Sequence, residues 1–210
     1  MRVLKTMAIL VLLGGLLSVP TGATAQTCSD VSSIQGFADF IVYKLQSGQR
    51  GQLLACLERS LKDSERNFSN TLSYKGMPLS GHVLEITRGE GWSDPALFKD
   101  FLDLLGELEA RLSQQDQKFA GLRGRLLNMQ SKAGFTVLHY SAARRLPDHV
   151  KFLLDSGEVN PRIQASGGDK LTAAELAGRI LETFRDDPEA RKVSQVFDEY
   201  RTNQGSPASQ

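Results

Sequence analysis

The sequence contains few of the residues that usually carry chemistry. Its 210 residues include two cysteines, three histidines and one tryptophan. No Cys-x-x-Cys pair and no histidine at ligand spacing accompanies the cysteines, which argues against a zinc site. The Gly-x-Ser-x-Gly turn of many serine hydrolases is absent, and Gly167-Gly168 follows no predicted strand, so a phosphate-binding loop is not expected either. We therefore expect no metal, no cofactor and no enzymatic activity.

The chain also lacks a strong excess of charge of either sign. It has 25 lysines and arginines against 24 aspartates and glutamates, a formal net charge of +1 at pH 7. The first twenty-five residues contain Arg2 and Lys5 and no acid, so without them 23 basic and 24 acidic residues remain, a net charge of −1. A chain with this balance has little to attract a phosphate backbone. We expect no nucleic acid among its partners.

The start of the chain has the composition of an export signal. Arg2 and Lys5 precede an apolar run from Met7 to Leu17, and Ala23-Thr24-Ala25 offers a small-residue cleavage site. This order predicts a signal peptide over residues 1–25. The run is shorter than the roughly 20 residues that span a bilayer, which disfavours an uncleaved anchor. The composition resembles a bacterial signal, so we expect a periplasmic or secreted protein with no membrane insertion after cleavage.

The two cysteines suggest a covalent link near the start of the mature chain. Paired cysteines in an oxidising compartment usually form disulfides, which predicts a bond between Cys28 and Cys56. If the first helix begins near Asp30, Cys28 lies at its far end while Cys56 lies about two turns into the next, antiparallel helix, so the residues before the helix would have to fold back. The alternative is two free buried or metal-binding thiols.

Residues 26–72 predict a helical hairpin. Two runs of apolar residues at helical spacing are separated by Ser-Gly-Gln-Arg-Gly, which favours two antiparallel helices joined by a short turn. The first run is Ile34, Phe37, Phe40, Ile41 and Leu45, and the second is Leu53, Leu54, Leu57 and Leu61. Because the ends of a repeat array differ from its interior, we expect this hairpin to cover one end of such an array.

The segment from Gly134 to Asn160 predicts a turn, two helices and a loop. Thr136 can satisfy free backbone donors at the start of the first helix, and small residues follow it. Proline disrupts the interior of a helix, so we expect the second helix to start at Pro147. We expect it to end at Gly157, because glycine readily adopts the conformation that ends a helix. This segment resembles an ankyrin repeat. It keeps the family's Thr136, Leu138, His139, Ala142, Val150, Leu153, Leu154, Gly157 and Asn160, and departs from it at Val137, Ser141 and Arg145.

A single repeat cannot bury its apolar face, so neighbouring repeats are expected. Downstream, Lys170–Ala177 matches the repeat start, with a partner helix over 189–200. Upstream, Lys75–Leu79 keeps a Gly and a Pro-Leu pair, and an insertion around 89–126 follows it, with helices over 95–111 and through Phe119, Leu122 and Leu126. We predict an all-α solenoid of about three ankyrin-like helix-turn-helix repeats over residues 73–201, capped by the hairpin and followed by a disordered tail over 202–210.

The resemblance implies a scaffold that binds a partner through its turn tips and inner helices, with His139 holding its turn by hydrogen bonds to backbone. The matching positions are Tyr74, Lys75 and Met77, then Lys132 and Phe135, then Arg162, Gln164 and Asp169. Trp92 in the insertion joins them. Exposed aromatic residues, Phe135 and Tyr74 with Trp92, are the sharper candidates because such side chains concentrate binding energy. The alternative is that all are ordinary exposed turn residues.

These observations favour a protein-binding function. We expect an exported ankyrin-like scaffold that acts as an inhibitor or immunity factor for an envelope-acting toxin or hydrolase. A chaperone-like protector of a periplasmic enzyme is the alternative within the same class. The alternative from another class is a small hydrolase with a site in residues 80–94, which contain Ser80 and His82.

Overall fold

The computed structural model describes residues 34–63, 73–74, 77–88, 94–166 and 169–205. The predicted signal peptide lies outside them, as does the start of the predicted cap. Helix α1 (Ile34–Gln46) and helix α2 (Arg50–Asp63) form the predicted hairpin. Gly48 at the turn has φ +69°, a left-handed conformation that glycine adopts without strain.

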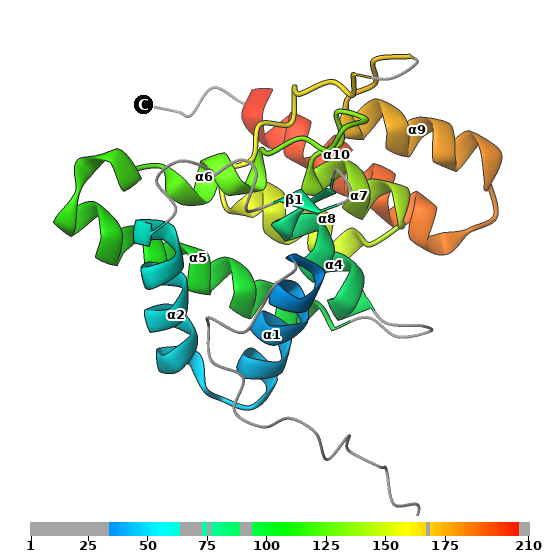
Figure 1. Ribbon diagram of the computed structural model, residues 1–210. Helices are drawn as coiled ribbons and strands as arrows, with labels where there is room; N and C mark the ends of the chain where they lie inside the picture. Colours follow the sequence, from blue (N-terminus) through cyan, green and yellow to red (C-terminus); the bar gives the residue numbers. More distant parts are fainter. Residues whose placement is uncertain (1–33, 64–72, 75–76, 89–93, 167–168, 206–210) are drawn as a thin grey trace, which may run out of the picture.

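Three further pairs of helices follow, and the prediction of an all-α fold with about three ankyrin-like repeats is confirmed. The pairs are α4 (Leu79–Arg88) with α5 (Pro95–Gln115), α7 (Val137–Ala143) with α8 (Pro147–Asp155), and α9 (Ala173–Thr183) with α10 (Pro188–Gly205). The first helices pack in one row, α4 on α7 on α9, and the second helices in another, α5 on α8 on α10. Figure 1 shows the C-terminal pair at the end of the molecule opposite the hairpin.

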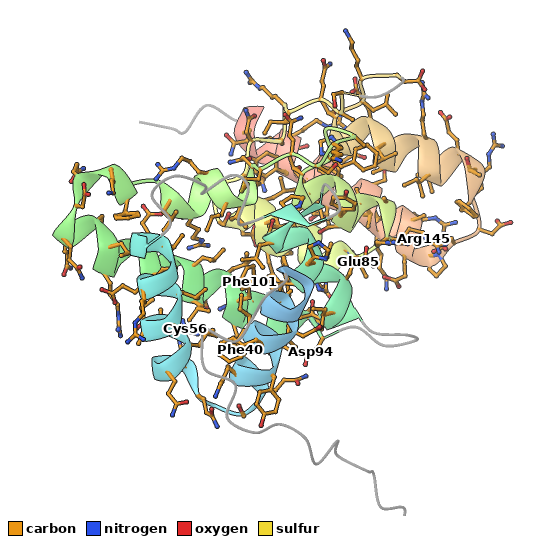
Figure 2. The ribbon with its side chains drawn as sticks, in the orientation of Figure 1. Phe40, Cys56, Glu85, Asp94, Phe101 and Arg145 are labelled. Carbon is orange, nitrogen blue, oxygen red and sulfur yellow. The ribbon has the colours of Figure 1, made fainter. Side chains whose placement is uncertain are left out.

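The hairpin extends both rows by one more pair, because α1 packs on α4 and α2 packs on α5. Its expected position as a cap on the repeats is therefore the observed one. Phe40 from α1 and Phe101 from α5 are both buried, and Figure 2 labels them where these helices meet. An ion pair joins α2 to α5, with the guanidinium of Arg50 3.0 Å from the carboxylate of Glu107.

The first repeat begins with a short β-hairpin rather than with helix. Strands β1 (Ser73–Tyr74) and β2 (Met77–Pro78) pair antiparallel, with Tyr74 opposite Met77. In the third repeat a single bridge joins Gln164 and Thr172. Regular strand structure in the described residues is limited to these short pairings, which lead into the inner helices.

The predicted insertion lengthens the second helix of the first repeat and adds a return segment. Pro95 starts α5, where it costs no hydrogen bond, and Asp94 caps it by accepting from the amide of Leu97 at 2.9 Å. The 21-residue helix extends beyond the expected end at Arg111. The short 3₁₀ helix η2 (Gln117–Phe119) and helix α6 (Leu122–Leu127) then return along α5.

The predicted disordered tail is wrong for its first four residues. Helix α10 continues through 202–205, because no glycine or proline interrupts it before Gly205 and the hydroxyl of Thr202 donates to the carbonyl of Asp198 at 2.9 Å. The remainder of the predicted tail, 206–210, lies outside the described residues. Within the described part of the chain, no helix combines the length and the apolar character that a membrane span requires.

Candidate functional site

His139 joins the second repeat to the third. Its ring is 1% exposed, and Nδ1 accepts from the amide of Thr136 at 3.2 Å and lies 2.9 Å from the Thr136 hydroxyl. Because Nδ1 accepts, the neutral ring carries its proton on Nε2, which donates to the carbonyl of Leu171 at 3.1 Å. Burial lowers the pKa of His139, and the Leu171 hydrogen bond opposes that shift. The expected structural role of this histidine is confirmed.

Two polar side chains extend the same connection along the turn before α7. The side-chain amide of Asn128 donates to the carbonyl of Glu158 at 2.7 Å, and its oxygen accepts from the amide of Asn160 at 2.6 Å. The side-chain amide of Gln130 donates to the carbonyl of Gln164 at 3.0 Å. The turn of one repeat therefore holds the backbone of the next repeat's loop at residues 158, 160 and 164.

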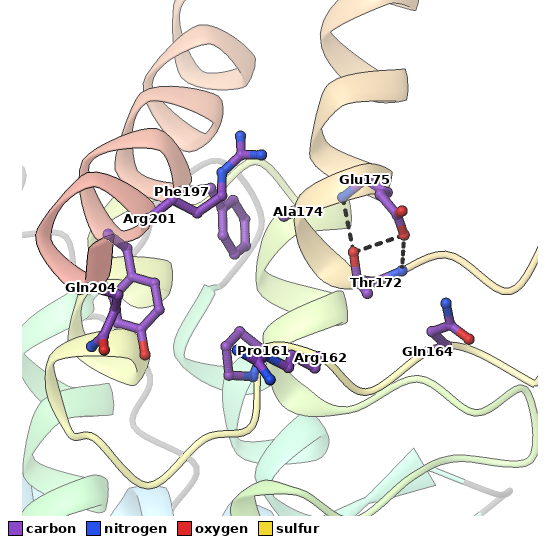
Figure 3. A pocket seen from close by; sticks show the side chains of 10 residues that line it. Pro161, Arg162, Gln164, Thr172, Ala174, Glu175, Phe197, Arg201 and Gln204 are labelled. Atoms are coloured by element: carbon purple, nitrogen blue, oxygen red, sulfur yellow. Dashed lines mark hydrogen bonds between the residues drawn. The ribbon is translucent and has the colours of Figure 1, made fainter. Parts of the chain in front are cut away.

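A groove of about 840 Å³ opens beside this loop, at the third repeat. The loop forms one side, the beginning of α9 a second, and the last turns of α10 a third (Figure 3). Helix α9 begins at this place because Thr172 and Glu175 form a reciprocal capping box. The lining residues are Pro161, Arg162, Gln164, Thr172, Ala174, Glu175, Phe197, Tyr200, Arg201 and Gln204.

Charged groups of both signs line the groove: Glu175 carries a negative charge, and Arg162 and Arg201 carry positive charges. Glu175 is occupied by its cap, since its carboxylate accepts from the amide and the hydroxyl of Thr172 at 2.8 and 2.9 Å, and these bonds lower its pKa. Arg201 pairs with Asp198 on the same helix. The exposed Arg162 has no acidic partner within the described residues; only its backbone amide is engaged, with the side chain of Asn160. The groove therefore offers one free guanidinium beside apolar surface.

The structure brings two of the predicted binding residues into this groove, Arg162 and Gln164. Asp169 does not line it and instead pairs with Arg179 on α9. Lys132 is exposed on the preceding turn, away from the groove lining. The two turns nevertheless touch, because the amide of Ser166 donates to the carbonyl of Ala133 at 3.1 Å.

Phe135 is half-buried and not fully exposed as expected, and its role in binding stays a prediction. Its ring stacks on that of His139, with 5.4 Å between centroids and 9° between planes. It also meets the ring of Tyr140 edge-on at 5.7 Å. These contacts make Phe135 part of the packing around the turn.

The remaining predicted binding residues stay predictions. The backbones of Tyr74 and Met77 form the β-hairpin of the first repeat. Lys75 and Trp92 lie outside the described residues.

Sequence reasoning missed the wall of the groove that α10 provides. Phe197, Tyr200, Arg201 and Gln204 come from its last turns, and the polar end of this helix was assigned to a tail. The spacing of Phe197, Tyr200 and Gln204, three and four residues apart, places them on one helical face and was the available signal.

The two named residues of the alternative hydrolase site, Ser80 and His82, are both buried on α4. Ser80 is 2% exposed, and its hydroxyl lies 3.4 Å from the carbonyl of Leu126, to which it donates. His82 is 7% exposed on the same helix, α4. Residues 89–93 of the proposed segment lie outside the described part. No group of three or more potential metal ligands gathers among the described residues.

Cys56 is 8% exposed on α2, and the described residues include no free cysteine. Cys28 lies outside them, so the predicted bond between the two stays a prediction. Peptide mapping by mass spectrometry without reductant tests it directly, because a bonded pair links the two peptides that contain Cys28 and Cys56.

Comparisons with known proteins leave the family open. No family model matches the chain, and no curated protein matches it. Among solved structures, it is similar to a chain in the crystal structure of the yeast ribosomal protein Rps3 in complex with its chaperone Yar1. The TM-score is 0.48 at 14% identity, and the likeness covers 83% of this chain and 98% of the other. A likeness at this level establishes no function for this chain.

Proposed function

We propose that this chain is an exported, ankyrin-like member of the repeat class that acts by binding another protein and not by catalysis. The export part rests on the sequence of residues 1–25. The binding part rests on one observation, the groove of about 840 Å³ with its free Arg162. A surface that is concave, partly apolar and carries an unpaired charged group is suited to recognition.

Within this class we propose an inhibitor or immunity factor for an envelope-acting toxin or hydrolase, with a chaperone-like protector as the alternative. Both functions need a rigid surface. The hydrogen bonds of His139 and Asn128 between repeats supply that rigidity, since they fix the loop that forms one side of the groove. A preformed surface loses less conformational entropy on binding than a flexible one.

The mature form, from Gln26, carrying an affinity handle and produced in the native host, tests this function. A stoichiometric partner recovered from the envelope fraction at moderate salt supports a dedicated binder. The partner's activity is then measured with and without this protein. A fall in activity supports inhibition, whereas slower loss of activity on heating supports protection. Recovery of no partner from the envelope of the host contradicts the proposal.

A further inference from the structure

The groove lies where the loop of a further repeat would pack. Between the second and third repeats, the loop after α8 packs against the side chains of Asn128 and Gln130. Asn160 and Arg162 take the corresponding positions one repeat later, with the same two-residue spacing. Within the described residues, no loop packs against them in turn. At the second repeat, the loop of the next repeat occupies this position. At the third repeat the same position is the groove, and no described loop occupies it.

Helix α10 explains why the space stays open. Helix α8 has 9 residues and gives way to a turn at Gly157, whose φ is +68°, and the chain then enters the next loop. Helix α10 also begins at a proline, Pro188, but has 18 residues. Its second half continues as helix where α8 has already given way to loop. The extra turns of α10 form the opposite side of the groove and leave the space beside the loop open.

Two side-chain donors, Arg162 in the groove lining and Asn160 next to the lining residue Pro161, have no acceptor within the described chain. Gln130 donates to a backbone carbonyl of the next repeat, but the guanidinium of Arg162 has no such partner. The side-chain oxygen of Asn160 accepts from the amide of Arg162 at 3.0 Å, which leaves its own amide group free to donate. Covering an arginine without a counter-charge is costly, so an occupant of the groove has to bring a negative group to it.

We propose that the groove binds an extended segment of a partner protein that carries an acidic side chain followed or preceded by an apolar one. The carboxylate pairs with Arg162, and the apolar side chain covers Tyr200 and Pro161. The segment's backbone takes the place of a further repeat's loop and accepts from Asn160. This inference rests on the proposed function and names the site and the chemistry of the recognised segment.

A displayed library of random ten-residue peptides, selected against the mature protein, is the probe. Enriched peptides are synthesised, and their Kd is measured by fluorescence anisotropy for the natural protein and for three variants. Arg162→Glu reverses the free charge, and Gln204→Glu adds a carboxylate to the opposite wall. Arg185→Glu is the matched control, because it makes the same charge change at an exposed arginine in the turn between α9 and α10, outside the groove lining. Circular dichroism and thermal unfolding confirm that each variant is folded.

The expected result is a set of peptides with an acidic residue next to an apolar one. Their Kd rises at least about tenfold with Arg162→Glu, rises less with Gln204→Glu, and stays unchanged with Arg185→Glu. The inference is overturned if no peptide is enriched, or if the enriched peptides bind the Arg162→Glu variant as tightly as the natural protein. It is also overturned if the protein self-associates and Arg162→Glu abolishes that, because a second copy would then be the occupant.

A further variant, Lys132→Glu on the preceding turn, separates this inference from the proposed function. A partner recovered from the envelope fraction that no longer binds Lys132→Glu but still binds Arg162→Glu would place recognition on the turn tips. In that case the function stands and the groove proposal falls. If neither a partner nor a peptide is found, both fall.

Discussion

The guanidinium of Arg145 lies over the ring of Phe184, 5.2 Å from its centroid. Arg145 belongs to the turn after α7, whereas Phe184 and the neighbouring Asp187, which pairs with Arg145, belong to the turn between α9 and α10. Arg145 has φ +58°, the left-handed conformation that favours glycine. The contacts between repeats offset the backbone cost of a non-glycine residue.

Substitution at Arg145 separates the two effects. Arg145→Gly relieves the backbone, by about 1 kcal/mol, but loses a cation–π contact and an ion pair of similar total size, so its stability should match that of the natural protein. Arg145→Ala keeps the backbone cost and loses both contacts, and should be about 1 kcal/mol less stable than Arg145→Gly. Urea unfolding measures the difference; an alanine variant as stable as the glycine variant would contradict this account.

Acid should destabilise the protein through His149. This residue is 1% exposed, its Nε2 has no hydrogen-bond partner in the part of the chain that the structure describes, and burial lowers its pKa from 6.5 to about 4. Between these values the unfolded chain binds a proton that the folded chain does not, so stability falls as the pH drops through that window, by up to about 3 kcal/mol. His139 has a lowered pKa and acts in the same direction.

The variant His149→Leu is the test, because leucine suits a buried position and has no group that titrates. Urea unfolding at pH 7.5 and pH 4.5 should show a smaller loss of stability for the variant than for the natural protein. The part that remains includes the contribution of His139. Equal losses in the two proteins would show that His149 does not titrate as its burial requires.

Gly134→Ala should destabilise much more than Gly157→Ala. Both glycines have positive φ, +78° and +68°, so both variants carry the left-handed strain of about 1 kcal/mol. A Cβ at Gly134 would lie 2.0 Å from the amide nitrogen of Ser166, whereas one at Gly157 would meet nothing within 4 Å. The two turns would have to separate in the first variant. Thermal unfolding of the two variants tests this difference, and similar melting temperatures would contradict the close contact between the turns.

Asn128→Ala and Asn160→Ala form a second matched pair. The first removes side-chain bonds to the backbone of the next repeat, at 2.6 and 2.7 Å, and should cost about 1–3 kcal/mol. The second removes one bond to the amide of Arg162 and should cost well under 1 kcal/mol. Chemical unfolding gives both values. If the two variants lost equal stability, Asn160 would already bind the backbone of another segment as Asn128 does. The space beside it would then be occupied, which would contradict the groove.

The helix boundaries of the second and third repeats could be predicted because local residues determine them. Thr136 and Thr172 each stand just before an inner helix, and both form capping boxes. Pro147 starts α8, as expected, because proline fits the first turn of a helix but not its interior. These signals act within one turn of helix, so one sequence is sufficient to read them.

The groove could not be predicted because it depends on contacts between distant segments. Arg162 is recognisable as a turn residue, but its lack of an acidic partner among the described residues follows only from the positions of Glu175 and Asp198 in space. The burial of Phe135 likewise depends on how its ring meets His139. The polar sequence Thr202–Gly205 favoured a tail, and only the structure shows that it completes a helix beside the loop.

The hydrogen bonds from one turn to the next loop make each helix pair depend on its neighbours for local protection. Among the described pairs, the hairpin α1–α2 and the pair α9–α10 each contact a neighbouring pair on one side only, so amide hydrogen exchange should be faster in these two than in the pairs between them, apart from fraying at helix ends. The groove spans the start of α9 and the end of α10. A ligand in it touches both helices and so slows exchange across the whole pair, including amides far from its own contacts.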